Sequence, residues 1–237
     1  MVGDGLNSPR HQGGKTVTSE NQNIFPDKYS MRNTRILNLK RVGLKGLSED
    51  IIETACAELV NAVSLEDNLL TELPWELHRM SELLTDLDLS KNKVSFIHSF
   101  VSRFSRITRI NLSCNLLRAL PMEFAGLQTL CELNISHNRF DHLPSCIYEL
   151  EKLEKLVAND NKIKQIDASD CGLGALRQLN YLNLNNNDIQ LVPPVLGNLT
   201  NITKLKLSGN PFRQPRHQIL ASGTGAILNY LRGRIPM

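Results

Sequence analysis

The sequence predicts an α/β solenoid: a right-handed, curved horseshoe with a parallel β-sheet on its concave face and a helical cap at its C-terminal end. Three observations lead to this prediction. An asparagine recurs about every 23 residues, apolar residues occupy fixed positions on both sides of it, and the pattern ends before a short amphipathic tail. We therefore divide the 237 residues into a disordered lead-in or linker (1–33), about eight repeats of which the first is degenerate (34–214), and a C-terminal helical cap (215–237).

The lead-in is rich in Gly, Ser, Asn, Gln and Pro and shows no apolar period. This composition is typical of segments that cannot bury enough apolar surface to fold. The stretch Gly13-Gly14-Lys15-Thr16 resembles the end of a phosphate-binding loop, but Pro9 stands where that motif requires a glycine. We therefore expect no nucleotide, and no other cofactor, to bind here.

The repeats share five apolar positions around each asparagine, at −8, −5, −3, +2 and, except in the last unit, +5. Apolar residues at alternate positions before the asparagine predict a short strand, followed by a turn and a helical or extended return arm. An earlier unit keeps the spacing but has Val42 in place of the asparagine. We call the aligned residues the asparagine ladder: Asn68, Asn92, Asn115, Asn138, Asn161, Asn187 and Asn210.

The asparagine is expected to satisfy main-chain groups that turn inward where each strand ends. An unpaired buried N–H or C=O costs roughly 1–3 kcal/mol. A side-chain amide carries both donors and an acceptor, so stacked asparagines can pair with the main chain of their own turn and of the next. Replacing Asn115 or Asn138 with leucine should therefore destabilise the protein by about 2 kcal/mol or more, although it adds apolar bulk.

Three segments depart from the repeat. Residues 48–59 predict a helix with Ser48 as its N-cap. The 26-residue unit carries extra residues within 167–179, for which we expect a wider turn on the convex side. Past Asn210, Ile219, Leu220 and residues 226–231 predict helices that cover the last repeat, with Thr224 just before the second of them.

The repeat pattern, L-x-x-L-x-L-x-x-N-x-L-x-x-L-P, is similar to that of leucine-rich-repeat proteins. Together with the endings G-N-P-F-R at 209–213 and G-T-x-A-I-L-x-Y-L-R-x-R-I-P at 223–236, it resembles the intracellular members of that family. The resemblance implies an interaction protein of the cytoplasm, or also of the nucleus, without a catalytic role. Because such proteins carry a further run of repeats upstream, it also implies a fragment or a short form.

The composition excludes several classes of function. A net charge of +3 is too small to indicate a nucleic-acid partner. No stretch approaches the 18 or so consecutive apolar residues of a membrane span, so we expect no membrane partner. The five cysteines are scattered and odd in number, which favours reduced thiols in the cytoplasm, and the six histidines form no metal-binding motif. We expect a monomer that binds another protein.

The concave face offers the candidate binding residues, because strand positions −6 and −4 point away from the core. Arg and Tyr are the residue types that most often anchor interfaces. A solvated sheet face with no partner is the alternative interpretation. Lys152, Lys155, Lys162 and Lys164 also form a basic cluster, interpreted as a solvated rim or as a site for an acidic segment. The candidate residues are Arg109, Glu132, Lys155 and Tyr181, with Asp88, Asn111, Asn134 and Asn183.

Three hypotheses follow for function. The first is a non-catalytic module that presents its concave sheet to a protein partner. The second is a regulatory scaffold for a small GTPase or phosphatase assembly. The third is a hydrolase, because Cys114, His137 and Asp160 occupy position −1 in three consecutive repeats and are the types that form a nucleophile, base and orienting acid. Against the third, no oxyanion donors or enclosed pocket are evident, so we predict no catalytic residues.

Overall fold

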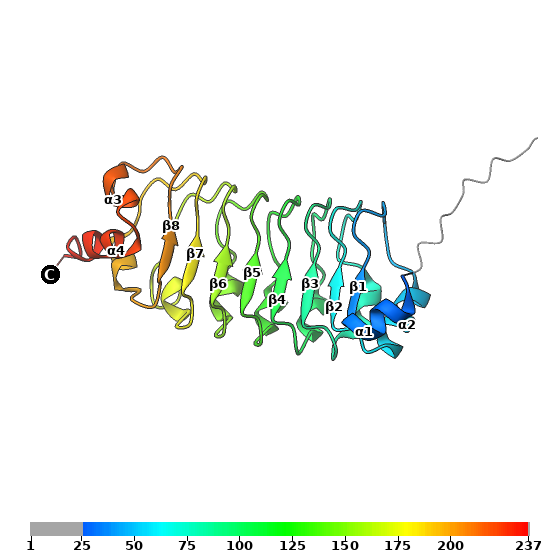
Figure 1. Cartoon of the computed structure of the whole chain (residues 1–237). Helices are drawn as coiled ribbons and strands as arrows, with labels where there is room; N and C mark the ends of the chain where they lie inside the picture. The colour runs from blue at the N-terminus through cyan, green and yellow to red at the C-terminus, as the bar shows by residue number, and fades with distance from the viewer. Residues whose placement is uncertain (1–25, 237) are drawn as a thin grey trace, which may run out of the picture.

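Eight short parallel strands form one sheet whose order follows the sequence (Figure 1). The structure is a computed structural model, and it describes residues 26–236. Equivalent repeat positions pair across neighbouring strands, as Asp86 does with Arg109 and Glu132 with Lys155. The strands are β1 (Ile36–Asn38), β2 (Ala62–Ser64), β3 (Asp86–Asp88), β4 (Arg109–Asn111), β5 (Glu132–Asn134), β6 (Lys155–Val157), β7 (Tyr181–Asn183) and β8 (Lys204–Lys206).

Six 3-10 helices form the return arms behind the sheet (Figure 1). A 3-10 helix advances further per residue than an α-helix, which suits a return arm of only a few residues. With the parallel sheet, they make the predicted solenoid. These helices are η1 (Trp75–Met80), η2 (Ser99–Arg103), η3 (Met122–Gly126), η4 (Ser145–Glu149), η5 (Leu173–Ala175) and η6 (Pro194–Asn198).

The core runs without interruption between the sheet and the return arms. The central residue of each strand is buried, as Leu87, Ile110 and Leu156 illustrate with at most 3% exposure. The predicted apolar positions of the seven complete repeats are all buried except the last, Phe212, which packs on the core while partly exposed. One cluster contains all of the buried positions, so stability arises from contacts between neighbouring repeats.

The N-terminal end is more ordered than the sequence predicted. Residues 28–33, assigned to the disordered lead-in, belong to helix α1 (Lys28–Thr34). The Asp27 carboxylate caps this helix by accepting hydrogen bonds from the main-chain N–H groups of Tyr29 and Ser30, and Met31 is 1% exposed in the core. The physical reason is that the first repeat has the exposed residue Thr34 at position −8, where the complete repeats have a buried apolar side chain. Met31 covers this repeat instead. The rest of the predicted lead-in, with the Gly13–Thr16 motif, lies in residues 1–25, outside the described residues.

The second N-terminal helix, α2 (Glu49–Ala57), confirms the helix predicted for 48–59, although it is shorter at its end. Ser48 occupies the N-cap position, but its side chain forms no capping hydrogen bond. The guanidinium of Arg32 lies 2.8 Å from the carboxylate of Glu58, which joins α1 to the end of α2. The two helices lie together at one end of the molecule (Figure 1).

The C-terminal end carries the predicted cap, formed by α3 (His217–Ala221) and α4 (Thr224–Arg232) (Figure 1). Helix α4 packs closely on η6 at Gly197. The approach is so close that a Cβ added to Gly197 would lie 2.5 Å from the main-chain nitrogen of Arg232. Thr224 is the first residue of α4 rather than the residue before it, a position that Gly223 takes with φ of 92°. The Thr224 hydroxyl instead accepts a hydrogen bond from the N–H of Leu205 in β8 (2.9 Å).

The extra residues of the 26-residue unit form a turn just before η5. Asp167 holds this turn, since its carboxylate accepts from the N–H of Ser169 (3.0 Å) and its carbonyl from the N–H of Leu173 (2.9 Å). Gly172 is required there, because a Cβ would lie 2.5 Å from the Asp167 carbonyl oxygen. None of the helices in residues 26–236 has the length and apolar character of a membrane span.

Candidate functional site

The exposed face of the sheet carries a row of side chains with alternating charge. Because the central residue of each strand is buried, positions −6 and −4 project to the opposite side. The Arg109 guanidinium lies 2.6 Å from the Asp86 carboxylate, and the Lys155 ammonium lies 3.0 Å from the Glu132 carboxylate. The hydrogen bond and the charge of Asp86 raise the pKa of Arg109. The centre of the row is therefore polar, internally paired and close to neutral.

A depression of about 280 Å³ lies over this row. It is lined by Ile110, Leu133 and Val157 together with the charged and amide residues around them. Five of the predicted binding residues line it, whereas Tyr181, Asp88 and Asn183 do not. These five are Arg109, Asn111, Glu132, Asn134 and Lys155.

Tyr181 lies beside the depression and is surrounded by lysines. The Lys155, Lys204 and Lys206 ammonium groups are 5.9, 5.4 and 5.7 Å from its ring centroid. Lys155 and Lys204 are the partners of Tyr181 in the strands on either side. These distances are within the range of cation–π attraction. Lys204 and Lys206 occupy positions −6 and −4 of the last repeat, so the sequence places them on this face with Tyr181 and Lys155, but they were not among the candidate binding residues.

The position −4 residues have a structural task that the sequence prediction missed. Asp88, Asn111, Asn134 and Asn183 each accept a hydrogen bond from the N–H two residues later, at 2.8 to 3.1 Å. Such turns offer the backbone a local partner where a strand ends. Asn183 is only 8% exposed, and its amide also donates to the Asn159 side chain. Burial leaves Asn183 with little surface to offer a partner.

Position −1 is occupied by residues in the left-handed backbone conformation throughout the complete repeats. The φ angles of Cys114, His137 and Asp160 are 55°, 52° and 55°, and the other repeats match them. The N–H of Cys114 donates to the carbonyl of Ser136 in the next repeat, and that of His137 to the carbonyl of Asn159. The left-handed turn therefore extends the hydrogen bonding between strands past the end of the sheet.

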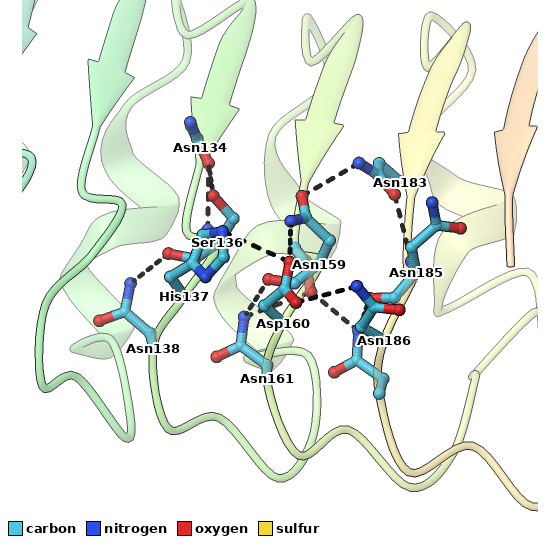
Figure 2. A network of polar contacts seen from close by, with 12 residues as sticks. Asn134, Ser136, His137, Asn138, Asn159, Asp160, Asn161, Asn183, Asn185 and Asn186 are labelled. Carbon is cyan, nitrogen blue, oxygen red and sulfur yellow. Dashed lines mark hydrogen bonds and ion pairs between the residues drawn. The ribbon is translucent and has the colours of Figure 1, made fainter. Parts of the chain in front are cut away.

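The three residues of the hydrolase hypothesis lie along this turn, and Figure 2 shows two of them, His137 and Asp160, among the surrounding amides. The imidazole of His137 is 3.4 Å from the Asp160 carboxylate. Burial raises the pKa of Asp160, but hydrogen bonds from the Asn159 and Asn186 amides, together with nearby His137, hold it below its usual value. Among the described residues, Cys114 has no hydrogen bond to His137. The carboxylate is thus part of an amide network rather than paired with histidine alone.

The asparagine ladder lies beneath this turn and is the most regular polar feature of the protein. The Asn115 amide donates to the carbonyls of Leu89, Leu112 and Ser113 at 2.9 to 3.2 Å, while its oxygen accepts from the N–H of Val94 (2.9 Å). Each asparagine therefore joins its own turn to the preceding repeat, and not to the next one as the sequence suggested. The Asn68 side-chain oxygen likewise accepts hydrogen bonds from the N–H groups of Val42 and Leu44, which belong to the degenerate repeat before it.

The cysteines and the possible metal ligands in residues 26–236 give little indication of a reactive or metal-binding site. All five cysteines are free. Burial raises the pKa of the Cys146 thiol to about 11, which disfavours the reactive thiolate. No group of three or more His, Cys, Asp or Glu side chains in these residues is arranged to hold a metal ion.

Comparison with known families finds the same repeat. Residues 105–163 match the family described as leucine rich repeat, and residues 178–199 match a second family with that description. The first match contains strands β4 to β6, and the second contains β7.

The curated relatives are much longer proteins. The chain is 32% identical over 185 residues to probable serine/threonine-protein kinase pats1 of Dictyostelium discoideum, an alignment that covers 77% of this chain and 5% of that protein. It is 32% identical over 203 residues to Ras guanine nucleotide exchange factor V of the same organism, covering 81% and 8%. A mouse leucine-rich repeat and calponin homology domain-containing protein is 30% identical, covering 56% and 19%. The chain thus spans a small part of each relative.

Solved structures share the architecture. An LRR protein of Leptospira interrogans superimposes with a TM-score of 0.63 at 28% identity, covering 75% of this chain and 49% of that one. An internalin of Listeria monocytogenes superimposes with a TM-score of 0.62 at 24% identity, covering 83% and 55%. The second likeness concerns the fold alone.

Proposed function

Because this chain is a leucine-rich-repeat protein, we propose that it is a non-catalytic interaction module whose concave sheet binds a protein partner. The observation that carries the proposal is the depression over β4 to β6, since it brings five of the sequence-predicted residues to one exposed surface. Arg109 and Tyr181 supply the residue types that most often dominate binding energy. The asparagine ladder in the turns that follow the strands keeps these strands in register, so little conformational freedom is lost on binding.

Capture from a cell lysate tests this proposal. We expect the intact chain to retain a partner that a variant with Arg109, Lys155 and Tyr181 all changed to alanine loses. The matched control changes Arg106, Lys93 and Tyr29 to alanine, because these exposed residues have the same types but lie outside the strands. Equal capture by the intact chain and the concave-face variant would show that this face is not the binding surface.

A regulatory scaffold is the second candidate, and it is supported by what the relatives are named. One is a Ras guanine nucleotide exchange factor and another is a probable kinase, and both align over most of this chain. In this case the partner captured through the concave face would bring small-GTPase or phosphatase activity with it. Assays of both activities on the captured material distinguish a scaffold from a module with an unrelated partner.

We do not propose the hydrolase. The left-handed turn accounts for the alignment of Cys114, His137 and Asp160, because every complete repeat places its −1 residue in that conformation. Alkylation with iodoacetamide at neutral pH is the check. A Cys114 thiol that reacts no faster than free cysteine supports the non-catalytic proposal, whereas a strongly accelerated reaction would reopen the hydrolase.

We further propose an intracellular location, in the cytoplasm or also the nucleus. Free cysteines suit a reducing compartment. The C-terminal sequences at 209–213 and 223–236 resemble the C-terminal portion of leucine-rich-repeat-containing protein 40, which is the relationship we propose within the family. A fluorescent fusion observed in cells checks the location.

A further inference from the structure

The charges of this protein are divided between its two ends. All 24 Asp and Glu residues precede Ile189, whereas six of the 27 Lys and Arg residues follow it. Residues 189–237 therefore carry a formal charge of +6 and residues 1–188 a charge of −3, which together give the net +3. The small overall charge conceals a strongly basic C-terminal end, which includes β8, α3 and α4.

The basic end reaches the concave face at Tyr181. Lys204 and Lys206 flank the buried Leu205 in β8, so both project to the same exposed side as the Tyr181 ring. With Lys155, they place three ammonium groups within 5.9 Å of one ring centroid. Among residues 26–236, the only carboxylate at ion-pair distance from these three lysines is Glu132, which pairs with Lys155 at 3.0 Å. Lys204 and Lys206 thus place like charge around an aromatic ring with no carboxylate paired to either of them in this part of the chain.

The charge balance around Tyr181 differs from that of the neighbouring row of paired charges. Asp86 neutralises Arg109, and Glu132 neutralises Lys155, so the depression offers a partner little net charge. At Tyr181 the field is positive, and a carboxylate brought between Lys204 and Lys206 would relieve their mutual repulsion. The ring beside them offers an apolar surface to the aliphatic part of an acidic side chain.

From this geometry we infer that Tyr181, Lys204 and Lys206 form the site that docks an acidic, extended segment of the partner protein. We call these three residues the β7–β8 basic site. The inference rests on the proposed function and deepens it, because it names the chemistry of the partner and the end of the concave face that recognises it. It also moves the acidic-partner site away from Lys162 and Lys164, which lie in the turn after β6.

An acidic protein segment fits this surface better than other anions. The lysines lie on the concave side of a curved sheet, which a flat membrane surface cannot follow. Nucleic-acid sites are built from basic grooves that follow the phosphate backbone, whereas the row next to Tyr181 alternates in sign. A peptide of moderate negative charge can place carboxylates at the β7–β8 basic site and polar groups over the paired row.

Fluorescence anisotropy with a labelled oligoglutamate peptide tests the inference on the full chain. At low ionic strength we expect binding that weakens as salt rises. Changing Lys204 and Lys206 together to glutamate should weaken it about tenfold or more. Tyr181→Leu keeps an apolar side chain but removes the ring that attracts the ammonium groups of Lys204 and Lys206. Because the two lysines are then held less firmly, binding should weaken roughly threefold.

The matched control changes Lys45 and Lys93 to glutamate. Both lysines are exposed, lie in the N-terminal half and give the same change in net charge, so we expect less than about a twofold effect. Thermal melting of each variant confirms that it is folded. Three results would overturn the inference: no oligoglutamate binding at low salt, equal weakening in the two double variants, or tighter binding of a labelled single-stranded oligonucleotide or of anionic vesicles.

The lysate capture described above separates this inference from the proposed function. If capture depends on the concave face but oligoglutamate does not bind, the acidic chemistry is wrong and the binding face stands. If capture is indifferent to every concave variant, the proposed function fails whatever the peptide does.

Discussion

At the scale of single residues, the backbone of each turn imposes two requirements, and only one of them is visible in the sequence as a recurring residue. The buried main chain at each turn requires an amide, and that amide recurs from Asn68 to Asn210. The left-handed conformation at position −1 requires no single residue type, so Lys91, His137 and Asp160 all occupy it. Only the last complete repeat uses glycine, at Gly209 with φ of 73°.

The left-handed position predicts an order of stability at His137, whose side chain is exposed. Asparagine tolerates this conformation and a β-branched side chain does not. We expect His137→Val to be less stable than His137→Asn by about 1–2 kcal/mol in urea unfolding. The same pair of replacements at Arg109, in a strand, is the control, and there valine should be no worse than asparagine. Equal stability of the two His137 variants would contradict the left-handed turn.

At the scale of elements, each repeat from β2 to β7 combines a three-residue strand, a polar turn and a 3-10 return arm, and side chains across the turns join successive repeats. Glu66 is the clearest case. Its carboxylate lies 2.6 Å from the Lys40 ammonium and 2.7 Å from that of Lys91, so it links three repeats. Hydrogen bonds from these two lysines lower the pKa of Glu66 to about 2.

This pKa predicts an acid-sensitive contribution to stability. Because the pKa is lower in the folded protein than the ordinary value of 4.5, the contribution is complete above pH 4.5 and is lost as the pH falls through about 2. Glu66→Gln should therefore be less stable than the unmodified protein near pH 7, by on the order of 1 kcal/mol, and the difference should vanish toward pH 2.

Urea midpoints measured across that pH range provide the check. Glu123→Gln is the control, because Glu123 is exposed and has no ion pair among residues 26–236. A difference between the Glu66 variant and the unmodified protein that stays constant from pH 7 to 2 would exclude the three-repeat link.

At the scale of the whole molecule, the sequence was sufficient to predict the solenoid, because apolar positions such as Ile110 and Leu112 repeat in every unit and all lie in one core. It was insufficient at the ends, where no repeat constrains the chain. Met31 is a single apolar residue in a polar segment, so its burial depended on a helix that the sequence pattern did not indicate.

The candidate site could be predicted only in part, for a related reason. Strand periodicity identified which side chains leave the core, so Arg109 and Lys155 were found. Periodicity does not reveal what neighbours do to one another across strands. The burial of Asn183 by its amide contacts and the gathering of lysines around Tyr181 both arise from pairing between repeats. These contacts required the register of the sheet.

The central claim is that the asparagine ladder holds the repeats together as one rigid sheet, on which the binding face depends. Asn138 shows where the cost of losing an amide arises. The carbonyls of Leu112 and Ile135 each accept from two ladder asparagines, so they keep a partner if Asn138 is lost. The N–H of Leu117 donates to the Asn138 oxygen (3.0 Å) and is buried without another acceptor among the described residues.

The free energy of unfolding of Asn138→Leu, measured in urea beside the unmodified protein, tests this claim most directly. Leaving the Leu117 N–H unpaired and removing three donated hydrogen bonds predicts a loss of about 2 kcal/mol or more, despite the added apolar side chain. An unchanged free energy of unfolding would contradict the claim, because the buried turns would then have no need of the amide.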